Sequence, residues 1–221
     1  MLHQEEDRIR VLIADDCPVT RAGIREILAE APDIDVVGEA ENGAEAQSLV
    51  ETLQPHILLL DFVMPGNHAL EVERWTRERY PHVITIVLTA HDRDAYLSQA
   101  IEAQVAGYLL KAEAPERLLE SIRCAAQGEC LIDGGQLARA RGWETTVLAR
   151  WESLTARERE VLIQLARGQT NCQLAETLDI ARRTVETHIQ RIRAKLGVAS
   201  TREAIAWAWE HGFVEDEAPF A

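Results

Sequence analysis

The sequence has no apolar run long enough to cross a membrane, and its first ten residues are acidic and polar. A membrane-spanning helix needs about 20 mostly apolar residues, and a secretory signal needs an apolar segment near its start. We therefore expect a cytoplasmic location and no membrane partner. Hydrophobic residues still make up 47% of the 221 residues, which is enough for one large domain or two small ones.

The sequence also lacks paired cysteines. Its four cysteines form no C-x-x-C pair and show no metal-ligand spacing; they are Cys17, Cys124, Cys130 and Cys172. In a reducing compartment such cysteines stay free, and free thiols are usually buried. We expect four free, mostly buried thiols, with a redox role for Cys17 as the alternative, because it lies beside an acidic pair.

Basic residues are scarce overall but unevenly distributed. The net charge is −14, which argues against nucleic-acid binding by the whole chain. Residues 1–130 hold 24 acidic and 11 basic residues, whereas residues 131–221 hold 13 and 12. Within the second part, residues 181–202 hold six basic residues and one acidic residue. This asymmetry favours a nucleic-acid partner for the C-terminal part.

Apolar runs and helical periodicity alternate over the first 128 residues, which predicts a doubly wound α/β domain with a parallel five-stranded sheet. The expected strands are Ile9–Ala14, Asp33–Ala40, Ile57–Leu60, Val83–Leu88 and Gly107–Leu110. The expected helices are Pro18–Ala31, Ala44–Leu53, Leu70–Tyr80, Ala95–Ala103 and Pro115–Gln127.

The rhythm stops after residue 128. Residues 129–152 are rich in glycine and read as a linker, although Trp143 and Trp151 suggest that part of it packs on a domain. Residues 153–213 read as an all-α domain of four helices, and residues 214–221 as a C-terminal tail. Capping boxes open the first and fourth of these helices at Thr155 and Ser200. Asn171 is expected to cap the second helix, and Gly197 to end the third.

Charged and polar residues follow four of the expected strands. In an open parallel sheet the ligand site lies at the carboxyl ends of the strands, which here carry Asp15 and Asp16, Asp61, Thr89 and Lys111. Clustered carboxylates call for a cation, and hard oxygen ligands suit Mg²⁺. A carboxylate in such a site can act as a nucleophile toward a phosphoryl group. Taken singly, each residue could instead be a solvated strand-end charge or a helix cap.

These residues closely resemble the receiver domain of bacterial two-component response regulators, over about residues 8–128. The resemblance rests on Asp15-Asp16, the run LLLDFVMPG, Thr89-Ala90 and the run GYLLK. It implies a flavodoxin-like (βα)5 receiver fold that is phosphorylated on Asp61 by a sensor histidine kinase. It further implies Mg²⁺ held by Asp15, Asp16, Asp61 and the carbonyl of Val63. Thr89 and Tyr108 would form the switch pair, and Lys111 would contact the phosphoryl group.

The third helix of the all-α domain is amphipathic. At 100° per residue, Val185, Ile189, Ile192 and Leu196 form one buried stripe. A short helix, a tight turn and then this helix make a helix-turn-helix, whose exposed face suits a major groove. An ordinary solvated helix face is the alternative reading. Ala181 stands at the start of the helix, where a capping side chain is missing.

The sequences LTARERE and TVETHIQRIRAKLGV resemble the LuxR-type DNA-binding domain. With the receiver, the whole chain resembles a response regulator of the NarL/FixJ type. The resemblance implies a transcription regulator, not an enzyme, that binds double-stranded promoter DNA and forms a homodimer on phosphorylation. The expected DNA-binding residues are Arg182, Arg183, Thr184, Glu186, Thr187, His188, Gln190, Arg191 and Lys195.

Other functions remain open from the sequence. The chain could be a regulator that works without phosphorylation, a phosphorylation-switched module that binds protein, or a regulator that senses a small molecule. An aspartyl-phosphate phosphatase is a further alternative, but those enzymes resemble one another in an Asp-x-Asp pair. Val63 occupies the second position of that pair here.

Overall fold

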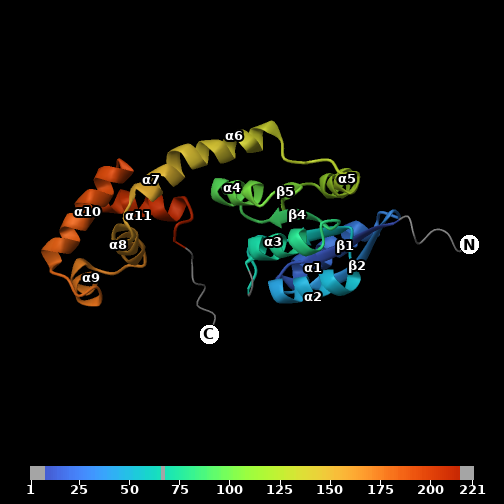
Figure 1. Ribbon diagram of the computed structural model, residues 1–221, viewed down its shortest axis with the longest axis horizontal. Coiled ribbons are helices and arrows are strands. Elements are labelled where there is room, and N and C mark those ends of the chain that lie inside the picture. The colour runs from blue at the N-terminus through green and yellow to red at the C-terminus, as the bar shows by residue number, and fades with distance from the viewer. Residues whose placement is uncertain (1–7, 66–67, 215–221) are drawn as a thin grey trace, which may run out of the picture. The chain divides into compact units, whose positions relative to one another are not determined.

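The computed structural model describes residues 8–65 and 68–214 (Figure 1). The chain forms two compact units, and the main division falls between Ala138 and Arg139. In the part of the chain so described, no helix is long and apolar enough to cross a membrane. The tail expected over residues 214–221 lies, from residue 215 onward, outside the described residues.

The first unit is a parallel sheet with the strand order β2-β1-β3-β4-β5. Its strands are β1 (Ile9–Ala14), β2 (Ile34–Ala40), β3 (Ile57–Leu60), β4 (Ile84–Thr89) and β5 (Gly107–Leu110). The helices that alternate with them are α1 (Pro18–Ala29), α2 (Gly43–Leu53), α3 (Ala69–Arg79), α4 (Asp94–Glu102) and α5 (Pro115–Ala126). The predicted doubly wound fold is confirmed, with strand and helix limits shifted by no more than two residues.

The central strand β3 explains why its sequence is continuously apolar. All four of its residues are buried, because helices cover both faces of the sheet. Ile57 and Leu59 pack into the core shared with α1 and α5. Leu58 and Leu60 pack into the core shared with α2 and α3. Packing on both faces holds the end of β3 in place. Asp61, the residue that follows, is therefore held at the carboxyl edge of the sheet.

Much of the segment expected as a linker is helical. It contains α6 (Gly134–Trp143), the π-helical turn η1 (Glu144–Leu148) and α7 (Ala149–Ser153). The ring of Trp151 stacks on Phe213 at 4.1 Å between centroids, and Trp143 stacks on the same ring at 6.0 Å. Both tryptophans therefore pack on the C-terminal unit, as their size in a glycine-rich segment indicated.

The C-terminal unit continues with α8 (Ala156–Ala166), α9 (Asn171–Thr177), α10 (Arg182–Leu196) and α11 (Thr201–Glu210). The capping box at Thr155 is confirmed. The prediction for α9 is wrong by one residue, because Thr170 is the cap and forms a capping box with Gln173. Threonine at this position accepts from the Gln173 amide, which leaves Asn171 as the first residue of the helix.

The cysteines are free, as expected, but they are not mostly buried. Cys17, Cys130 and Cys172 are exposed, and Cys124 is half-buried. The general preference of free cysteines for buried positions did not predict this, because local position decides exposure. Cys17 lies at the N-cap of α1, and Cys130 lies in the segment after α5.

Candidate functional site

Three carboxylates meet at the carboxyl ends of β1 and β3. Each of Asp15, Asp16 and Asp61 offers an oxygen atom, and these atoms lie within 4.8 Å of one another. Asp15 and Asp61 are buried, at 1% and 7% exposure, whereas Asp16 is exposed. The arrangement follows from parallel strand pairing, since Ala14 and Leu60 are paired in the register of β1 and β3. Oxygen ligands at this spacing, one of them open to solvent, fit a hard divalent cation such as Mg²⁺.

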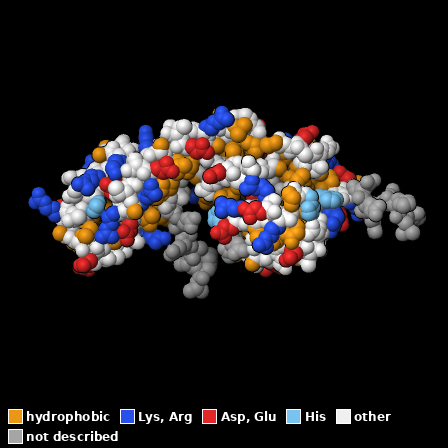
Figure 2. Space-filling model, in the orientation of Figure 1, with side chains coloured by type: hydrophobic (Ala, Val, Ile, Leu, Met, Phe, Trp, Pro, Cys, Tyr) orange, Lys and Arg blue, Asp and Glu red, His pale blue; other side chains and the backbone are white. Residues whose placement is uncertain are grey.

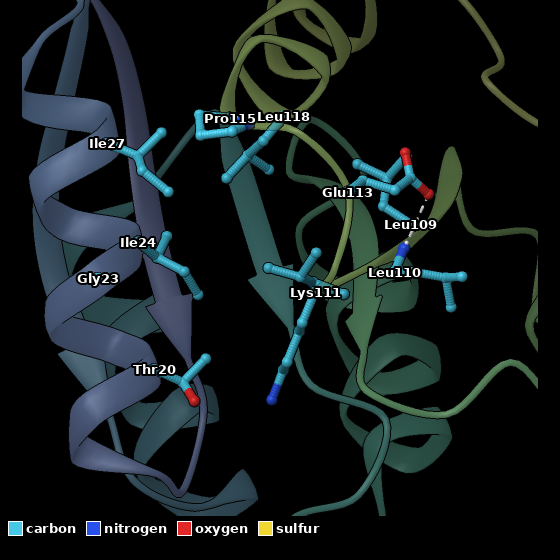
Figure 3. Close-up of a pocket in the computed structure, with 11 residues that line it drawn as sticks. Thr20, Gly23, Ile24, Ile27, Leu109, Leu110, Lys111, Glu113, Pro115 and Leu118 are labelled. Atoms are coloured by element: carbon cyan, nitrogen blue, oxygen red, sulfur yellow. Dashed lines mark hydrogen bonds between the residues drawn. The ribbon is translucent and has the colours of Figure 1, made fainter.

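Lys111 closes the site from the end of β5. Its Nζ lies 2.6 Å from Asp15 Oδ2 and 2.8 Å from Asp61 Oδ2. In Figure 3 its side chain runs from the end of β5 toward Thr20 at the start of α1. Leu109, Leu118 and Ile24 line an apolar pocket alongside it. The predicted convergence of the strand-one, strand-three and strand-five ends is therefore present as direct ion pairs.

Burial sets the electrostatics of this cluster. It raises the pKa of the Asp61 carboxyl above its ordinary value, and the Lys111 ammonium offsets part of that rise. Burial alone would lower the pKa of Lys111, but the attraction of Asp15 and Asp61 outweighs it and raises that pKa. A partly buried ammonium between two carboxylates is a fixed positive charge, which can pair with phosphoryl oxygens as well as with carboxylates.

Arg21 on α1 positions the first carboxylate pair, and the sequence reasoning missed it. Its guanidinium is buried and donates to the backbone carbonyl of Asp15 at 2.7 Å. It also forms ion pairs with Glu41 at 2.6 Å and Glu39 at 3.4 Å, at the end of β2. The sequence did carry a signal for this role. Arg21 lies three residues into an expected helix, and acidic residues end the neighbouring expected strand.

The expected switch residues are buried beside the cluster. Thr89 is fully buried, and its hydroxyl accepts from the His91 amide at 3.2 Å. Tyr108 is 2% exposed, and its hydroxyl donates to the His91 carbonyl at 3.0 Å. The loop that carries His91 therefore contacts both side chains. Val63 is half-exposed, and its amide faces Asp61 Oδ1 at 3.4 Å.

Helix α10 presents two different faces in the second unit. Val185, Ile189, Ile192 and Leu196 are buried, so the predicted apolar stripe is confirmed. Arg183, Thr187, Gln190 and Arg191 are exposed. The helix starts at Ala181 without a side-chain cap, as expected, and ends at Gly197 with φ of 69°. Figure 2 shows Lys and Arg side chains on the visible face of this unit.

Four of the expected DNA-binding side chains already have polar contacts within the protein, namely Arg182, Glu186, Thr187 and Lys195. Lys195 Nζ lies 2.7 Å from Glu158 Oε2, and it also donates to the Ser153 carbonyl at 2.8 Å. Arg182 pairs with Glu186 across one helical turn at 3.4 Å. His188 is half-buried, and its Nδ1 has no hydrogen-bond partner among the residues that the structure describes.

Comparisons with known proteins agree with this division. Residues 11–123 match the response regulator receiver domain, and residues 152–208 match the luxR family of bacterial regulatory proteins. The chain is 35% identical over 201 residues to the nitrate/nitrite response regulator NarL of Escherichia coli strain K12, covering 89% of this chain and 93% of NarL. It is 34% identical over 217 residues to the uncharacterised transcriptional regulatory protein YxjL of Bacillus subtilis strain 168, covering 95% and 99%.

A solved RcsB–DNA complex is similar to this chain with a TM-score of 0.61 and 25% identity, covering 92% of this chain and 98% of RcsB. Two matching domains and two relatives aligned over nearly their full length define the class. The chain belongs to the response regulators, and it joins a receiver domain to a LuxR-type DNA-binding domain. This family consists of DNA-binding transcription regulators.

Proposed function

We propose that a sensor histidine kinase phosphorylates Asp61 in the presence of Mg²⁺, and that phosphorylation promotes binding of a homodimer to promoter DNA. The observation that carries the proposal is the environment of Asp61. Its carboxylate lies 2.8 Å from the Lys111 ammonium, and it shares a 4.8 Å cluster with Asp15 and Asp16. This combination provides a nucleophile, a fixed positive charge and ligands for a cation.

In the transfer step, a carboxylate oxygen of Asp61 attacks the phosphorus of a phosphohistidine. An O–P bond forms on Asp61 while the P–N bond breaks, and the imidazole nitrogen leaves with the electron pair and takes up a proton. Asp15, Asp16, Asp61 and the Val63 carbonyl would hold Mg²⁺, which neutralises phosphoryl oxygens when it is bound. Lys111 pairs with one of those oxygens.

Thr89 and Tyr108 would report the new charge to the rest of the receiver. The Thr89 hydroxyl lies at the end of the strand next to β3, and a phosphoryl group on Asp61 offers it a hydrogen-bond acceptor. Both side chains are tied to the backbone of His91. Movement of the hydroxyl therefore frees the His91 amide, and the Tyr108 ring can fill the space that the threonine leaves.

Helix α10 is the proposed reading element for DNA. Its exposed polar side chains Thr187 and Gln190 suit base edges, and Arg183 and Arg191 suit phosphates. The same helix carries three further residues expected to bind DNA, namely Thr184, Glu186 and His188. A dimer presents two such helices to two half-sites. Support comes from a relative, since one solved structure holds two RcsB dimers on two DNAs.

Acetyl phosphate with Mg²⁺ tests the phosphorylation step, with intact mass as the measurement. The wild type should gain one phosphoryl group, and Asp61→Asn should gain none. Asp35→Asn, at an exposed position on β2, is the matched control and should label normally. Gel shift and light scattering before and after labelling test the DNA step. If the fully labelled protein shows the same molecular mass by light scattering and the same DNA affinity as the unlabelled protein, a regulator that works without phosphorylation is favoured.

A further inference from the structure

The outer edge of β5 is covered by the chain that follows α5. Strand β5 is last in the sheet order, so one of its edges has no partner strand in the part of the chain that the structure describes. The Leu131 amide donates to the Ala106 carbonyl at 2.7 Å, and Gln136 Nε2 donates to the Tyr108 carbonyl at 2.9 Å. Native proteins often cover a sheet edge with a loop. Here the covering segment also leads into helix α6.

Gln136 ties this edge to the first turn of α6. Asp133 Oδ1 accepts from the Gln136 amide at 2.8 Å, and Gln136 Oε1 accepts from the Asp133 amide at 3.1 Å. These reciprocal bonds have the pattern of a capping box, which fixes the start of a helix. The Nε2 atom of the same side chain is the donor to Tyr108. One side chain therefore joins the cap of α6 to the backbone of β5.

Gly107 makes room for Leu131 on β5. A glycine inside a strand weakens the strand, and Gly107 does not have the positive φ that would call for one. A Cβ at this position would lie 3.0 Å from Leu131 Cδ1 and 3.3 Å from Leu131 Cβ, so the leucine would have to shift. Leu131 also packs against the core that contains Ile86 and Leu109. Side-chain packing and two hydrogen bonds therefore hold this segment on the strand.

We propose that residues 131–136 form a clamp that holds the start of α6 on β5 while Asp61 is unphosphorylated, and that phosphorylation loosens this clamp. The inference rests on the proposed function, because the phosphoryl group on Asp61 is the trigger. Helix α6 begins in the first unit and ends in the second, since the division falls after Ala138. The clamp therefore sets how firmly the receiver holds the first turn of the segment that leads to the DNA-binding domain.

Tyr108 is the residue through which the trigger reaches the clamp. Its hydroxyl donates to the His91 carbonyl at 3.0 Å, and its own carbonyl accepts from Gln136. When its ring moves into the space that Thr89 leaves, the bond to His91 breaks and the backbone of β5 shifts at the residue that holds the clamp. A hydrogen bond weakens steeply as its angle departs from linearity, so a small shift of the Tyr108 carbonyl loosens the clamp.

Hydrogen–deuterium exchange of residues 129–138 in the full chain measures the clamp. This segment contains the bonded amides of Leu131 and Leu137. Acetyl phosphate and Mg²⁺ supply the phosphoryl group, and intact mass gives the labelled fraction of the same sample. Phosphorylation should speed exchange of the segment about three- to tenfold, as expected when about one hydrogen bond is lost from a local opening equilibrium. Exchange in Asp61→Asn should not respond to the same reagents.

Gln136→Glu keeps an oxygen that caps α6 but replaces the donor to Tyr108 with a second acceptor. Before phosphorylation, its segment 129–138 should exchange about three- to tenfold faster than in the wild type, and phosphorylation should add little. Gln173→Glu is the matched control, because it makes the same change in the capping box of α9. Leu131→Ala removes the packing on β5 and should act like Gln136→Glu. It carries the test if Gln136→Glu does not fold.

Unchanged or slower exchange in fully labelled wild type would overturn the inference and leave the proposed function standing. Wild-type exchange in the folded Gln136→Glu and Leu131→Ala variants would overturn it too, and would mean that Gln136 serves only as a helix cap. A sample that gains no phosphoryl mass would remove the trigger together with the proposed function, and the intact mass identifies that case.

Discussion

The ammonium of Lys195 lies 2.7 Å from Oε2 of Glu158, and this pair joins the end of α10 to the first turn of α8. Glu158 is 2% exposed and also accepts from the Thr155 amide at 2.8 Å, which completes the capping box of α8. One carboxylate therefore serves a helix cap and an ion pair. Lys195 was expected to contact DNA, and this geometry gives it a structural role in the free protein.

Lys195→Met should destabilise the C-terminal unit by about 1.5–3 kcal/mol, because the hydrogen bonds of a charged group are lost while the aliphatic chain is kept. Urea unfolding followed by tryptophan fluorescence measures this, since four of the five tryptophans lie after residue 138. Arg202→Met, at an exposed position early in α11, is the control and should change little. An unfolding free energy equal to that of the wild type would contradict the structural role.

The ion pair between Lys195 and Glu158 also predicts that the stability of the C-terminal unit depends on pH. Burial acts to raise the pKa of Glu158, but Lys195 and the Thr155 cap outweigh it and hold this pKa below the ordinary 4.5. A carboxyl with a lowered pKa in the folded state stabilises the fold above its ordinary pKa, and this contribution is lost as pH falls through the folded value. The stability difference between wild type and Lys195→Met should therefore shrink below about pH 4.5. A constant difference across that range would count against the pair.

Arg21→Met should slow the labelling of Asp61 by acetyl phosphate and lower the stability of the receiver by about 1–3 kcal/mol. Arg21 holds the carbonyl of Asp15, so its loss leaves a buried acceptor unpaired and loosens the acidic pair. Labelling rate and unfolding are measured on the same samples. Arg25→Met is the control, because Arg25 is exposed and pairs only at the surface, with Glu39 at 3.2 Å. Normal labelling in a folded Arg21→Met protein would show that Arg21 does not position Asp15 for phosphorylation of Asp61.

Chelation of divalent cations should abolish the labelling of Asp61, because three carboxylates and a phosphoryl group repel one another without a cation. Asp16→Asn should raise the Mg²⁺ concentration needed for half-maximal labelling, and it should leave the fold intact because Asp16 is exposed. Labelling rate as a function of Mg²⁺ is the measurement. Undiminished labelling in excess EDTA would show that the acidic cluster has another purpose.

The sequence predicted the sheet well because its signals were local and strong. Strand β3 is apolar throughout. The residues that directly follow β1, β3 and β5 are Asp15, Asp61 and Lys111, so the parallel topology alone brought them together. Arg21 was missed for the opposite reason. Its role depends on which helix face meets the sheet and on partners far along the chain, such as Glu41. Such pairings follow from tertiary packing and not from spacing within one segment.

Helix α10 lacks a capping side chain at its start, and introducing one should stabilise the helix. Ala181 has the extended backbone of an N-cap but makes no side-chain hydrogen bond to α10. Ala181→Ser should raise the unfolding free energy of the C-terminal unit by about 0.5–2 kcal/mol. Ala194→Ser adds the same hydroxyl inside the helix and should lower stability slightly, since serine forms helices less well than alanine. Equal effects of both substitutions would mean that the cap site is not free to accept a hydroxyl.

On the exposed face of α10, we expect some side chains to contact base edges and others to contact phosphates. Gln190 projects away from the buried stripe and can pair bidentately with adenine, whereas Arg191 lies at the flank of the same face. Gln190→Ala should cost about 1–3 kcal/mol at the preferred site and relax specificity at one base pair. Arg191→Ala should weaken binding to all sequences about equally. It should also reduce, by about one unit, the slope of the logarithm of the binding constant against the logarithm of the salt concentration.

Arg191 is a better probe of phosphate contact than Lys195, because loss of Lys195 also breaks its ion pair with Glu158. The measurement is a titration of specific and scrambled duplexes at several salt concentrations, with the folded state of each variant checked by fluorescence. If Gln190→Ala lowers affinity uniformly while Arg191→Ala changes base preference, α10 enters the groove with a different rotation. The groove-facing residues would then be those nearer Thr184 and His188.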